Sequence, residues 1–465
     1  MMIFSLSVPR FRLSASPLSL MLERIFQLRQ RGTTVPREII AGLTTFAAMA
    51  YVLAVNPDIL SGTGMDRGAL ITVTAITAAV STVLMALMTN FPLALAPGMG
   101  INAFFAFTIC GIYQVPWQQA LGMVFVNGAV FLLLSATGVR EKIVRSIPYE
   151  LKIAITCGIG LFIAFLGLKN GGVIVAHPAT FVSHGNFATP SVALCLGGVA
   201  VTFLLVSRRV PGAIVLGVAL TTVAGLFVPD GQGGTITKAA GSWFAAPASP
   251  APVFWKLSFE FLYSSEAFFK ALPIILTLLL VDMFDNLGTL IGVARRTGLL
   301  RPDGTLPKAG RALMADSIAA MLSAISGTST VVSYVESASG VEAGGRTGLT
   351  ALTTAALFLL ALFATPLILM VPPQATAPAL VVVGIFMMQS VSEIAMTEFR
   401  KAAPLVLTIL AIPLTFSIAE GIGLGLLASA LLALGTGRPK EFPLLGYVIA
   451  GVFFLSFFHI FPFSG

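Results

Sequence analysis

The chain has 465 residues, of which 57% are hydrophobic and only 10% are charged, and its mean hydropathy is +0.96. A soluble domain is about one-quarter charged, so this composition excludes a soluble protein built around one core. The apolar runs are long and unbroken, which excludes an outer-membrane barrel with alternating strands of about ten residues. We therefore predict an all-α polytopic membrane protein.

The net charge of +8 comes from Lys and Arg grouped between the apolar runs, as in cytoplasmic loops, so it requires no nucleic acid partner. The three cysteines lie inside apolar segments, and their spacing indicates neither a disulfide nor a metal site. We expect no cofactor. Residues 1–35 contain Arg10 and Arg12 and show no convincing signal-peptide cleavage site, so we expect a cytoplasmic N-terminal extension.

Apolar runs of roughly 20 residues, the length that crosses the hydrocarbon core of a bilayer, recur along the chain. The first seven predicted spans, within 36–228, cover 38–58, 69–90, 96–111, 117–138, 150–169, 190–207 and 210–228. A Gly- and Pro-rich loop at 229–266 follows, and seven more spans, within 267–436, cover 267–293, 310–326, 328–341, 347–371, 376–396, 403–418 and 419–436. The last part, 437–465, contains the apolar stretch Leu444–Phe461, which is an interfacial helix, a re-entrant segment or a fifteenth span.

Charge predicts the orientation of these 14 spans. With a cytoplasmic N-terminus, the loops after even-numbered spans lie inside, and short inside loops retain Lys and Arg. These loops carry Arg140, Lys142, Arg145, Arg208, Arg209, Arg295, Arg296, Arg301, Lys308, Arg346, Arg400, Lys401, Arg438 and Lys440. The loop at 229–266, predicted outside, carries only Lys238 and Lys256. Seven spans per half place the second half in the membrane upside down, as inverted repeats.

Two corresponding spans are interrupted. Residues 96–105 of span three read APGMGINAFF, and residues 326–337 of span ten read SGTSTVVSYVES. Backbone that leaves a helix at membrane depth must line a cavity or be buried in protein. In secondary transporters with inverted repeats, such broken segments meet at the substrate site near the midplane. The two segments therefore predict a binding site.

Four acids stand out within the predicted spans: Asp282 and Asp285 in span eight, Asp316 in span nine and Glu336 in span ten. A charged side chain in a span costs roughly 2.5–3.5 kcal/mol on insertion scales, which favours a functional role. Asp282, Asp285 and Asn286 share one helical face, where burial and like charge favour a bound proton. We expect these acids to couple transport to protons. The alternative is that these acids only bridge neighbouring helices through Asn and Ser partners. For Asp316 this alternative has the same weight as a functional role.

Three residues of span three suit a flat heterocycle. Asn102 offers both a donor and an acceptor, and Phe104 and Phe105 offer aromatic faces. Base–aromatic stacking contributes about 1–3 kcal/mol per base in other systems. Simple packing is an equal alternative for these two rings, because the chain has 35 phenylalanines. Carboxylate, amide and aromatic groups together describe a pocket for a small planar molecule.

At these residues the sequence resembles the nucleobase–ascorbate transporter superfamily, and within it the AzgA-like adenine, guanine and hypoxanthine permeases. The resemblance runs from about Val35 to Leu434 and is carried by 44–58, 96–105, 281–290 and 327–337. It implies 14 spans in two inverted seven-span repeats, with a strand before a half-helix in spans three and ten. It also implies a core domain of spans 1–4 and 8–11, a gate domain of spans 5–7 and 12–14, and a homodimer.

The resemblance further assigns the site. Its substrate-binding acids match Asp282 or Asp285 and Glu336, its span-three amide matches Asn102, and its span-nine acid matches Asp316. Ungapped alignment of span eight favours Asp282 with Asn286 as its partner, and Thr330 lies in the matched part of span ten. The implied function is a proton-coupled symporter that imports purine nucleobases across the inner or plasma membrane.

Two other functions are less consistent with these residues. An anion or sulfate-type permease of the same architecture would point half-helix N-termini at its anion, where Asp282 and Glu336 would be repulsive. An intramembrane enzyme would need a nucleophile and base or a set of metal ligands, and no histidine lies in the predicted spans.

Overall fold

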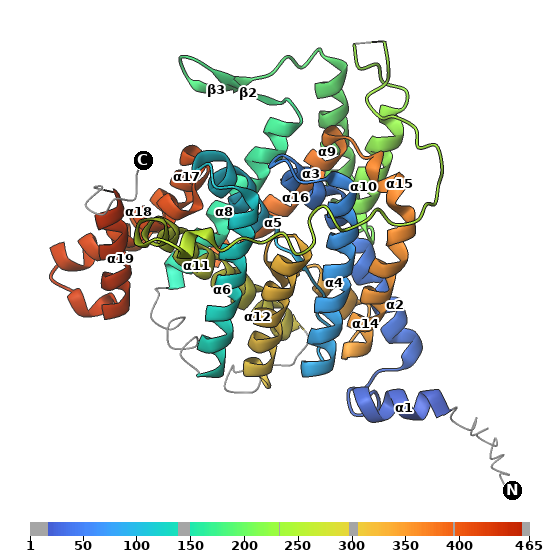
Figure 1. Ribbon diagram of the computed structural model, residues 1–465, viewed down its shortest axis with the longest axis horizontal. Helices are drawn as coiled ribbons and strands as arrows, with labels where there is room; N and C mark the ends of the chain where they lie inside the picture. Colours follow the sequence, from blue (N-terminus) through green and yellow to red (C-terminus); the bar gives the residue numbers. More distant parts are fainter. Residues whose placement is uncertain (1–16, 138–148, 232, 297–305, 394–395, 458–465) are drawn as a thin grey trace, which may run out of the picture.

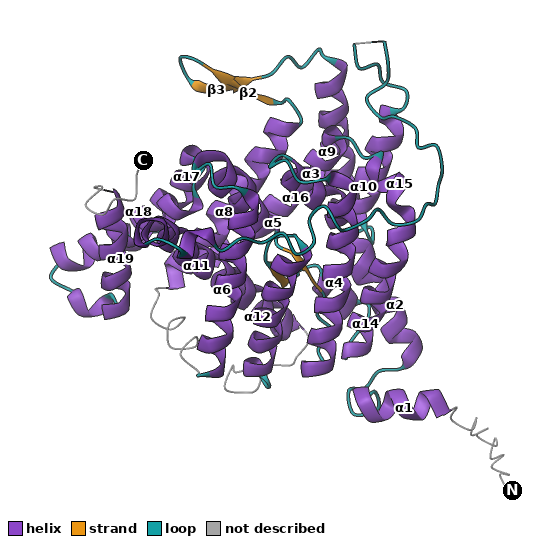
Figure 2. Cartoon of the chain, viewed as in Figure 1, coloured by secondary structure: helices purple, strands orange, loops and turns teal. Residues whose placement is uncertain are grey.

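The computed structural model describes residues 17–137, 149–231, 233–296, 306–393 and 396–457. Helices make up nearly all of the regular structure, and many of them run along one common direction (Figures 1 and 2). The helix nearest the N-terminus lies at one end of this bundle, and a β-hairpin lies at the other (Figure 1). The predicted all-α fold class is confirmed.

The helices fall where the apolar runs predict them. In the first half they are α1 (Pro17–Phe26), α2 (Val35–Met49), α3 (Val52–Ser61), α4 (Arg67–Thr89), α5 (Met99–Ala103), the π-helix η1 (Phe104–Ile112), α6 (Trp117–Ala136), α8 (Tyr149–Asn170), α9 (Pro190–Ser207) and α10 (Ala213–Gly225). In the second half they are α11 (Ser265–Arg296), α12 (Ala309–Ser326), α13 (Ser337–Glu342), α14 (Gly348–Ala361), α15 (Thr365–Leu369), α16 (Pro373–Met388), α17 (Phe399–Thr415), α18 (Ile418–Gly435) and α19 (Leu444–Phe457).

Within the described residues, eight helical segments are long and apolar enough to cross a membrane. They are Val35–Ser61, Arg67–Thr89, Trp117–Ala136, Tyr149–Asn170, Pro190–Ser207, Gly348–Leu369, Pro373–Ser392 and Ile418–Gly435. Each of the other predicted spans also coincides with a helix, or with a strand and a short helix. In the apolar stretch Leu444–Phe461, residues 444–457 form α19, whose 14 residues rise about 21 Å, and residues 458–461 lie outside the described residues.

The two interrupted segments contain short strands, as predicted for spans three and ten. β1 (Leu95–Pro97) pairs antiparallel with β4 (Val331–Ser333), with Ala96 opposite Val332. The pair lies in the middle of the bundle, near α5 (Figure 2). The backbone N–H of Gly98 extends the pairing by donating to the carbonyl of Thr330 at 3.0 Å. A Cβ on Gly98 would lie 2.9 Å from Cγ2 of Val332, so a larger residue would force that side chain to shift.

The first predicted span contains a local tight turn, here called the α2–α3 break, which the apolar pattern does not predict. Its two helices, α2 and α3, are separated at Ala50 and Tyr51. The first turn of α3 is tight, because the N–H of Leu53 bonds to the carbonyl of Ala50, three residues back. The side chain of Tyr51 is 3% exposed and points into the protein at this break.

The residues between α8 and α9 form an unpredicted hairpin of β2 (Ile174–His177) and β3 (Phe181–His184). It stands at the end of the bundle opposite α1 (Figure 1). The long loop at 229–266 runs along the bundle and bonds to several helices. The hydroxyl of Thr72 on α4 donates to the carbonyl of Ala248 at 2.9 Å, and the N–H of Trp255 donates to Ile325 on α12 at 2.8 Å.

Helices far apart in the sequence pack in two groups. In one group α12 packs against α4 and α6, and α14 packs against α2 and α4. In the other group α16 packs against α8, α9 and α10, and α17 packs against α8 and α18. The strand pair and the predicted acids belong to the first group.

Candidate functional site

Two buried acids are joined by one amide. Asn286 on α11 donates from Nδ2 to Oδ1 of Asp282 at 2.7 Å and to Oδ2 of Asp316 on α12 at 2.9 Å. Asp282 is 0% exposed, and Asn286 and Asp316 are each 2% exposed. Asp282 and Asn286 stand four residues apart on one helix, so their side chains lie on the same face. Asp282 of span eight and Asp316 of span nine therefore share one amide donor.

Two more elements complete this network. Nδ2 of Asn127 on α6 donates to Oδ2 of Asp282 at 3.1 Å, so both carboxylate oxygens of Asp282 accept from amides. The backbone N–H of Ser333 on β4 donates to Oδ1 of Asn286 at 2.8 Å. Hydrogen bonds among α6, α11, α12 and β4 thus hold Asp282, Asn286 and Asp316 beside the β1–β4 strand pair.

A second polar group lies on the short helix that follows β1. Asn102 on α5 accepts at Oδ1 from the hydroxyl of Ser329, which precedes β4. Asn102 and Thr330 are both 0% exposed. Within the described residues, Nδ2 of Asn102 and Oγ1 of Thr330 have no hydrogen-bond partner. Buried polar atoms are normally paired, so both atoms are available to bind a ligand.

Glu336 follows β4 and stands at the start of α13. Its Oε1 accepts a hydrogen bond of 2.7 Å from the hydroxyl of Tyr51, at the break between α2 and α3. Glu336 is partly exposed, in contrast to Asp282 and Asp316. Among the predicted acids whose side chains the structure describes, it is therefore the most exposed.

Phe104 and Phe105 lie where α5 passes into the π-helix η1, and both rings are 0% exposed. π-helical turns are uncommon and occur frequently at functional sites. The rings belong to the large apolar cluster of the bundle. Asp285 lies on α11, three residues after Asp282, but its side chain is outside the described residues.

Sequence reasoning missed two partners of the predicted acids, Asn127 and Tyr51. Asn127 is a single amide inside an apolar run, which is the same signal that identified Asn102. Tyr51 gives no such signal, because an aromatic residue in an apolar run is ordinary packing.

At the other end of α3, a polar contact joins the two packing groups. The guanidinium of Arg67 at the start of α4 lies 3.5 Å from the carboxylate of Asp58, and Nη2 of Arg67 donates to the carbonyl of Val371 at 3.0 Å. The hydroxyl of Thr376 on α16 donates to Oδ2 of Asp58 at 3.2 Å.

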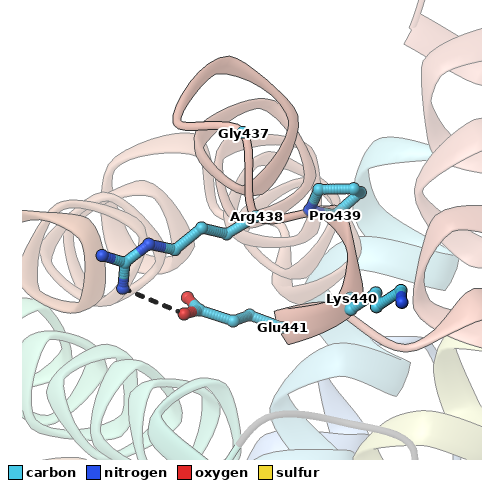
Figure 3. A pocket seen from close by; sticks show the side chains of 5 residues that line it. All are labelled: Gly437, Arg438, Pro439, Lys440 and Glu441. Carbon is cyan, nitrogen blue, oxygen red and sulfur yellow. Dashed lines mark hydrogen bonds and ion pairs between the residues drawn. The ribbon is translucent and has the colours of Figure 1, made fainter.

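An open hollow of about 430 Å³ lies away from these acids, in the link between α18 and α19 (Figure 3). Gly437, Arg438, Pro439, Lys440 and Glu441 line it. Arg438 donates to Glu441 at 3.1 Å, and Arg438 together with Arg400 holds the pKa of the Glu441 carboxyl below its usual range. Because five consecutive exposed residues of one loop line this hollow, it is a feature of the protein surface. We assign it no part in the site.

Comparison with known proteins agrees with the resemblance read from the motifs. A model of the permease family matches residues 36–424. The guanine/hypoxanthine permease PbuG of Bacillus subtilis is 42% identical over 94% of this chain and 99% of that protein. The adenine permease AdeP of Escherichia coli is 40% identical over 94% of this chain and 96% of that protein.

Solved structures share the fold. The transmembrane domain of the cyanobacterium bicarbonate transporter BicA matches with a TM-score of 0.62 at 16% identity, over 83% of this chain and 96% of that chain. At this identity the likeness concerns the fold alone.

Proposed function

The chain belongs to the permease family, in its nucleobase–ascorbate transporter group, and on that premise we propose that it imports purine nucleobases with protons by alternating access. Its relatives are permeases and not enzymes. The observation that carries the proposal is the meeting of Asp282, Asn286 and Asp316 beside β4, with Glu336 three residues beyond that strand.

The substrate class is supported by the relatives and by the chemistry of the site. Two relatives that match almost the whole chain are named for adenine and for guanine and hypoxanthine. A purine is flat and carries N–H donors and ring-nitrogen acceptors along its edges. Glu336 offers an acceptor, Asn102 offers an amide donor, and Thr330 offers a hydroxyl, so the site complements such an edge.

We assign Glu336 to the ring N–H groups, because it is the more open acid, and Asn102 and Thr330 to the remaining polar edge. Phe104 and Phe105 are proposed to stack on the ring once the site opens. Asp282 is harder to reach, because both of its carboxylate oxygens already accept from Asn127 and Asn286. A purine that contacts Asp282 directly must displace one of these amides.

Proton coupling is proposed for the acids, with Asp282 and Asp316 at its centre. Their carboxylates share one donor group, Nδ2 of Asn286, and both are almost fully buried. We propose that the pair binds and releases one proton during transport. Glu336 and Asp285 are proposed to contribute to the same proton exchange.

Alternating access is supported by the packing of the helices. The strand pair and the acids lie in the group that contains α4, α12 and α14, whereas α8, α16 and α17 form the other group. We propose that the first group acts as the core and the second as the gate. Inverted repeats, a cytoplasmic N-terminus, the plasma or inner membrane and a homodimer belong to the same proposal.

An anion permease is the rival function, and the shared fold with a bicarbonate transporter is its only support here. Electrostatics favour the purine. The acids Asp282 and Glu336 would repel an anion near the β1–β4 strand pair, but they would accept hydrogen bonds from the N–H groups of a neutral heterocycle.

The experiment is uptake of radiolabelled hypoxanthine, adenine and bicarbonate in cells that express the chain, with and without a protonophore. The proposal predicts purine accumulation that the protonophore abolishes. Uptake of bicarbonate without uptake of either purine would overturn the substrate class, and purine accumulation that persists with the protonophore would overturn proton coupling.

A further inference from the structure

Tyr51 is a buried phenol that the proposed mechanism does not yet use. It lies at the break between α2 and α3, and its carbonyl accepts from the N–H groups of Ala54 and Val55 at 3.0 and 2.9 Å. These bonds tie its backbone to the first turn of α3. Its hydroxyl is thereby placed 2.7 Å from Oε1 of Glu336, which comes from the other half of the chain.

This bond changes what the Glu336 carboxylate can recognise. A carboxylate with both oxygens open accepts two parallel N–H donors, the arrangement that makes bidentate pairs strong and specific. A phenol that donates to one oxygen occupies part of that edge. The carboxylate is then better suited to a donor edge with one N–H than to an edge with two.

Purines differ in this respect. Guanine presents two adjacent donors, the ring N1–H and the 2-amino group, which match the two oxygens of a carboxylate. Hypoxanthine presents the same N1–H beside a C2–H, which is no comparable donor. A single hydrogen bond to a charged group changes affinity by ~10-fold or more, so the state of one oxygen is enough to alter the preference between these two bases.

We propose that Tyr51 is a specificity-determining residue that occupies one oxygen of Glu336 and so disfavours purines with a two-donor edge relative to purines with one. The inference rests on the proposed function, because it assumes that Glu336 binds the purine. It concerns the choice among purines, which the fold and the names of the relatives leave undefined for this chain.

The alternative is that Tyr51 only holds Glu336 or α3 in position. Removal of the hydroxyl would then weaken the binding of all purines by the same factor, because it would disturb the position of Glu336 or α3 and not a contact with one particular base. A ratio of two affinities in one variant separates these readings, since a uniform loss cancels in the ratio.

The experiment compares Tyr51→Phe with the unchanged protein and with Tyr447→Phe. Tyr447 is a matched control, because its hydroxyl also donates a hydrogen bond, to the carbonyl of Pro439 at 3.1 Å, but near the link before α19 and away from Glu336. Uptake of labelled hypoxanthine is inhibited with unlabelled guanine or unlabelled hypoxanthine. Tyr51→Phe should raise the affinity for guanine relative to hypoxanthine by ~10-fold, and Tyr447→Phe should leave that ratio unchanged.

Binding provides a second readout that does not need transport. The purified variants are heated with either base, and the concentration that gives half of the thermal stabilisation is measured. Tyr51→Met, which removes the hydroxyl with different packing, should shift the ratio in the same direction. An unchanged ratio in both variants, with normal purine uptake by the unchanged protein, would overturn this inference alone. No purine uptake or binding by the unchanged protein would overturn the proposed function itself.

Discussion

Nδ2 of Asn286 on α11 lies 2.9 Å from Oδ2 of Asp316 on α12, and the same amide also donates to Asp282. An amide has two N–H groups, so Asn286 can serve both acids at once. The two carboxylates are thereby held as a pair beside β4. This arrangement places Asp316 in one hydrogen-bond network with Asp282.

The pair predicts a specific phenotype for Asp316→Asn. The variant keeps a similar shape but removes one of two sites for a shared proton. We expect concentrative purine uptake to fall by more than about 10-fold, while exchange of labelled for unlabelled purine continues, because exchange requires no net proton movement. Uptake assays in vesicles measure the concentrative transport, and counterflow assays in vesicles measure the exchange. Equal loss of both, with normal protein in the membrane, would instead indicate that Asp316 braces the site.

Glu336 should be required for purine binding. Glu336→Gln keeps an acceptor oxygen but lacks the charge, and Glu336→Ala removes both, so uptake should fall in the first and be abolished in the second. Glu342→Gln is the matched control, because Glu342 lies at the end of the same short helix and is exposed. Membrane content is measured by immunoblot. Near-normal uptake by Glu336→Ala would remove Glu336 from the proposed site.

External pH should alter transport in one direction. A carrier that brings protons in with its substrate is loaded at acidic external pH, so purine uptake should rise as the pH falls and decline at alkaline pH. Asp282→Asn removes one titrating group and should flatten this profile. Initial rates between pH 5 and 8 provide the measurement. Sodium-dependent uptake that is indifferent to pH would contradict the proton as the coupling ion.

A large part of this architecture is accessible from sequence, because the bilayer imposes it locally. Apolar runs give the helices, and the interrupted runs at 96–105 and 326–337 give the strand pair. Asn102, Asp282 and Glu336 are conspicuous because polar atoms in an apolar run require a reason. Partners are less accessible. Asn127 carries the same local signal as Asn102, but its pairing with Asp282 is identified only when α6 is brought beside α11. Tyr51 gives no local signal and is identified only when the α2–α3 break is brought beside α13.

Glu38 is an example of a structural acid that the sequence analysis did not single out. Its carboxylate is 0% exposed and accepts from the backbone N–H groups of Arg346, Thr347 and Thr350 at 2.8–3.2 Å, and from the hydroxyls of Thr347 and Thr350 at 2.7 and 2.6 Å. These groups include the N–H of Thr350 in the first turn of α14, where a negative charge is stabilising.

Replacement of Glu38 should therefore act on stability. Glu38→Ala leaves several buried donors unpaired and should lower the free energy of unfolding by about 2 kcal/mol or more. Glu266→Ala, which removes an exposed pair with Lys270 on α11, should have almost no effect. Thermal unfolding in detergent measures both. A Glu38→Ala protein as stable as the Glu266→Ala protein would show that the carboxylate is dispensable.

Topology rests on charge, and two exposed threonines test it. Thr235 lies in the loop predicted to face outward, and Thr436 follows α18 beside the basic residues Arg438 and Lys440. Short loops with Lys and Arg resist translocation, whereas a long loop with few charges does not. We expect Thr235 outside and Thr436 inside, because seven predicted spans separate them.

Single cysteines at the two threonines, in a background where Cys110, Cys157 and Cys195 are replaced, make this measurable with an impermeant thiol reagent. Cys157 and Cys195 are buried and Cys110 is partly buried, so their conservative replacement should be tolerated. The Thr235→Cys protein should be labelled in intact cells, and the Thr436→Cys protein only after permeabilisation. Labelling of both from outside would place an even number of spans between them. The second set of seven would then not be inverted relative to the first, and the antiparallel pairing of β1 with β4 would need another explanation than two inverted repeats that meet at the midplane.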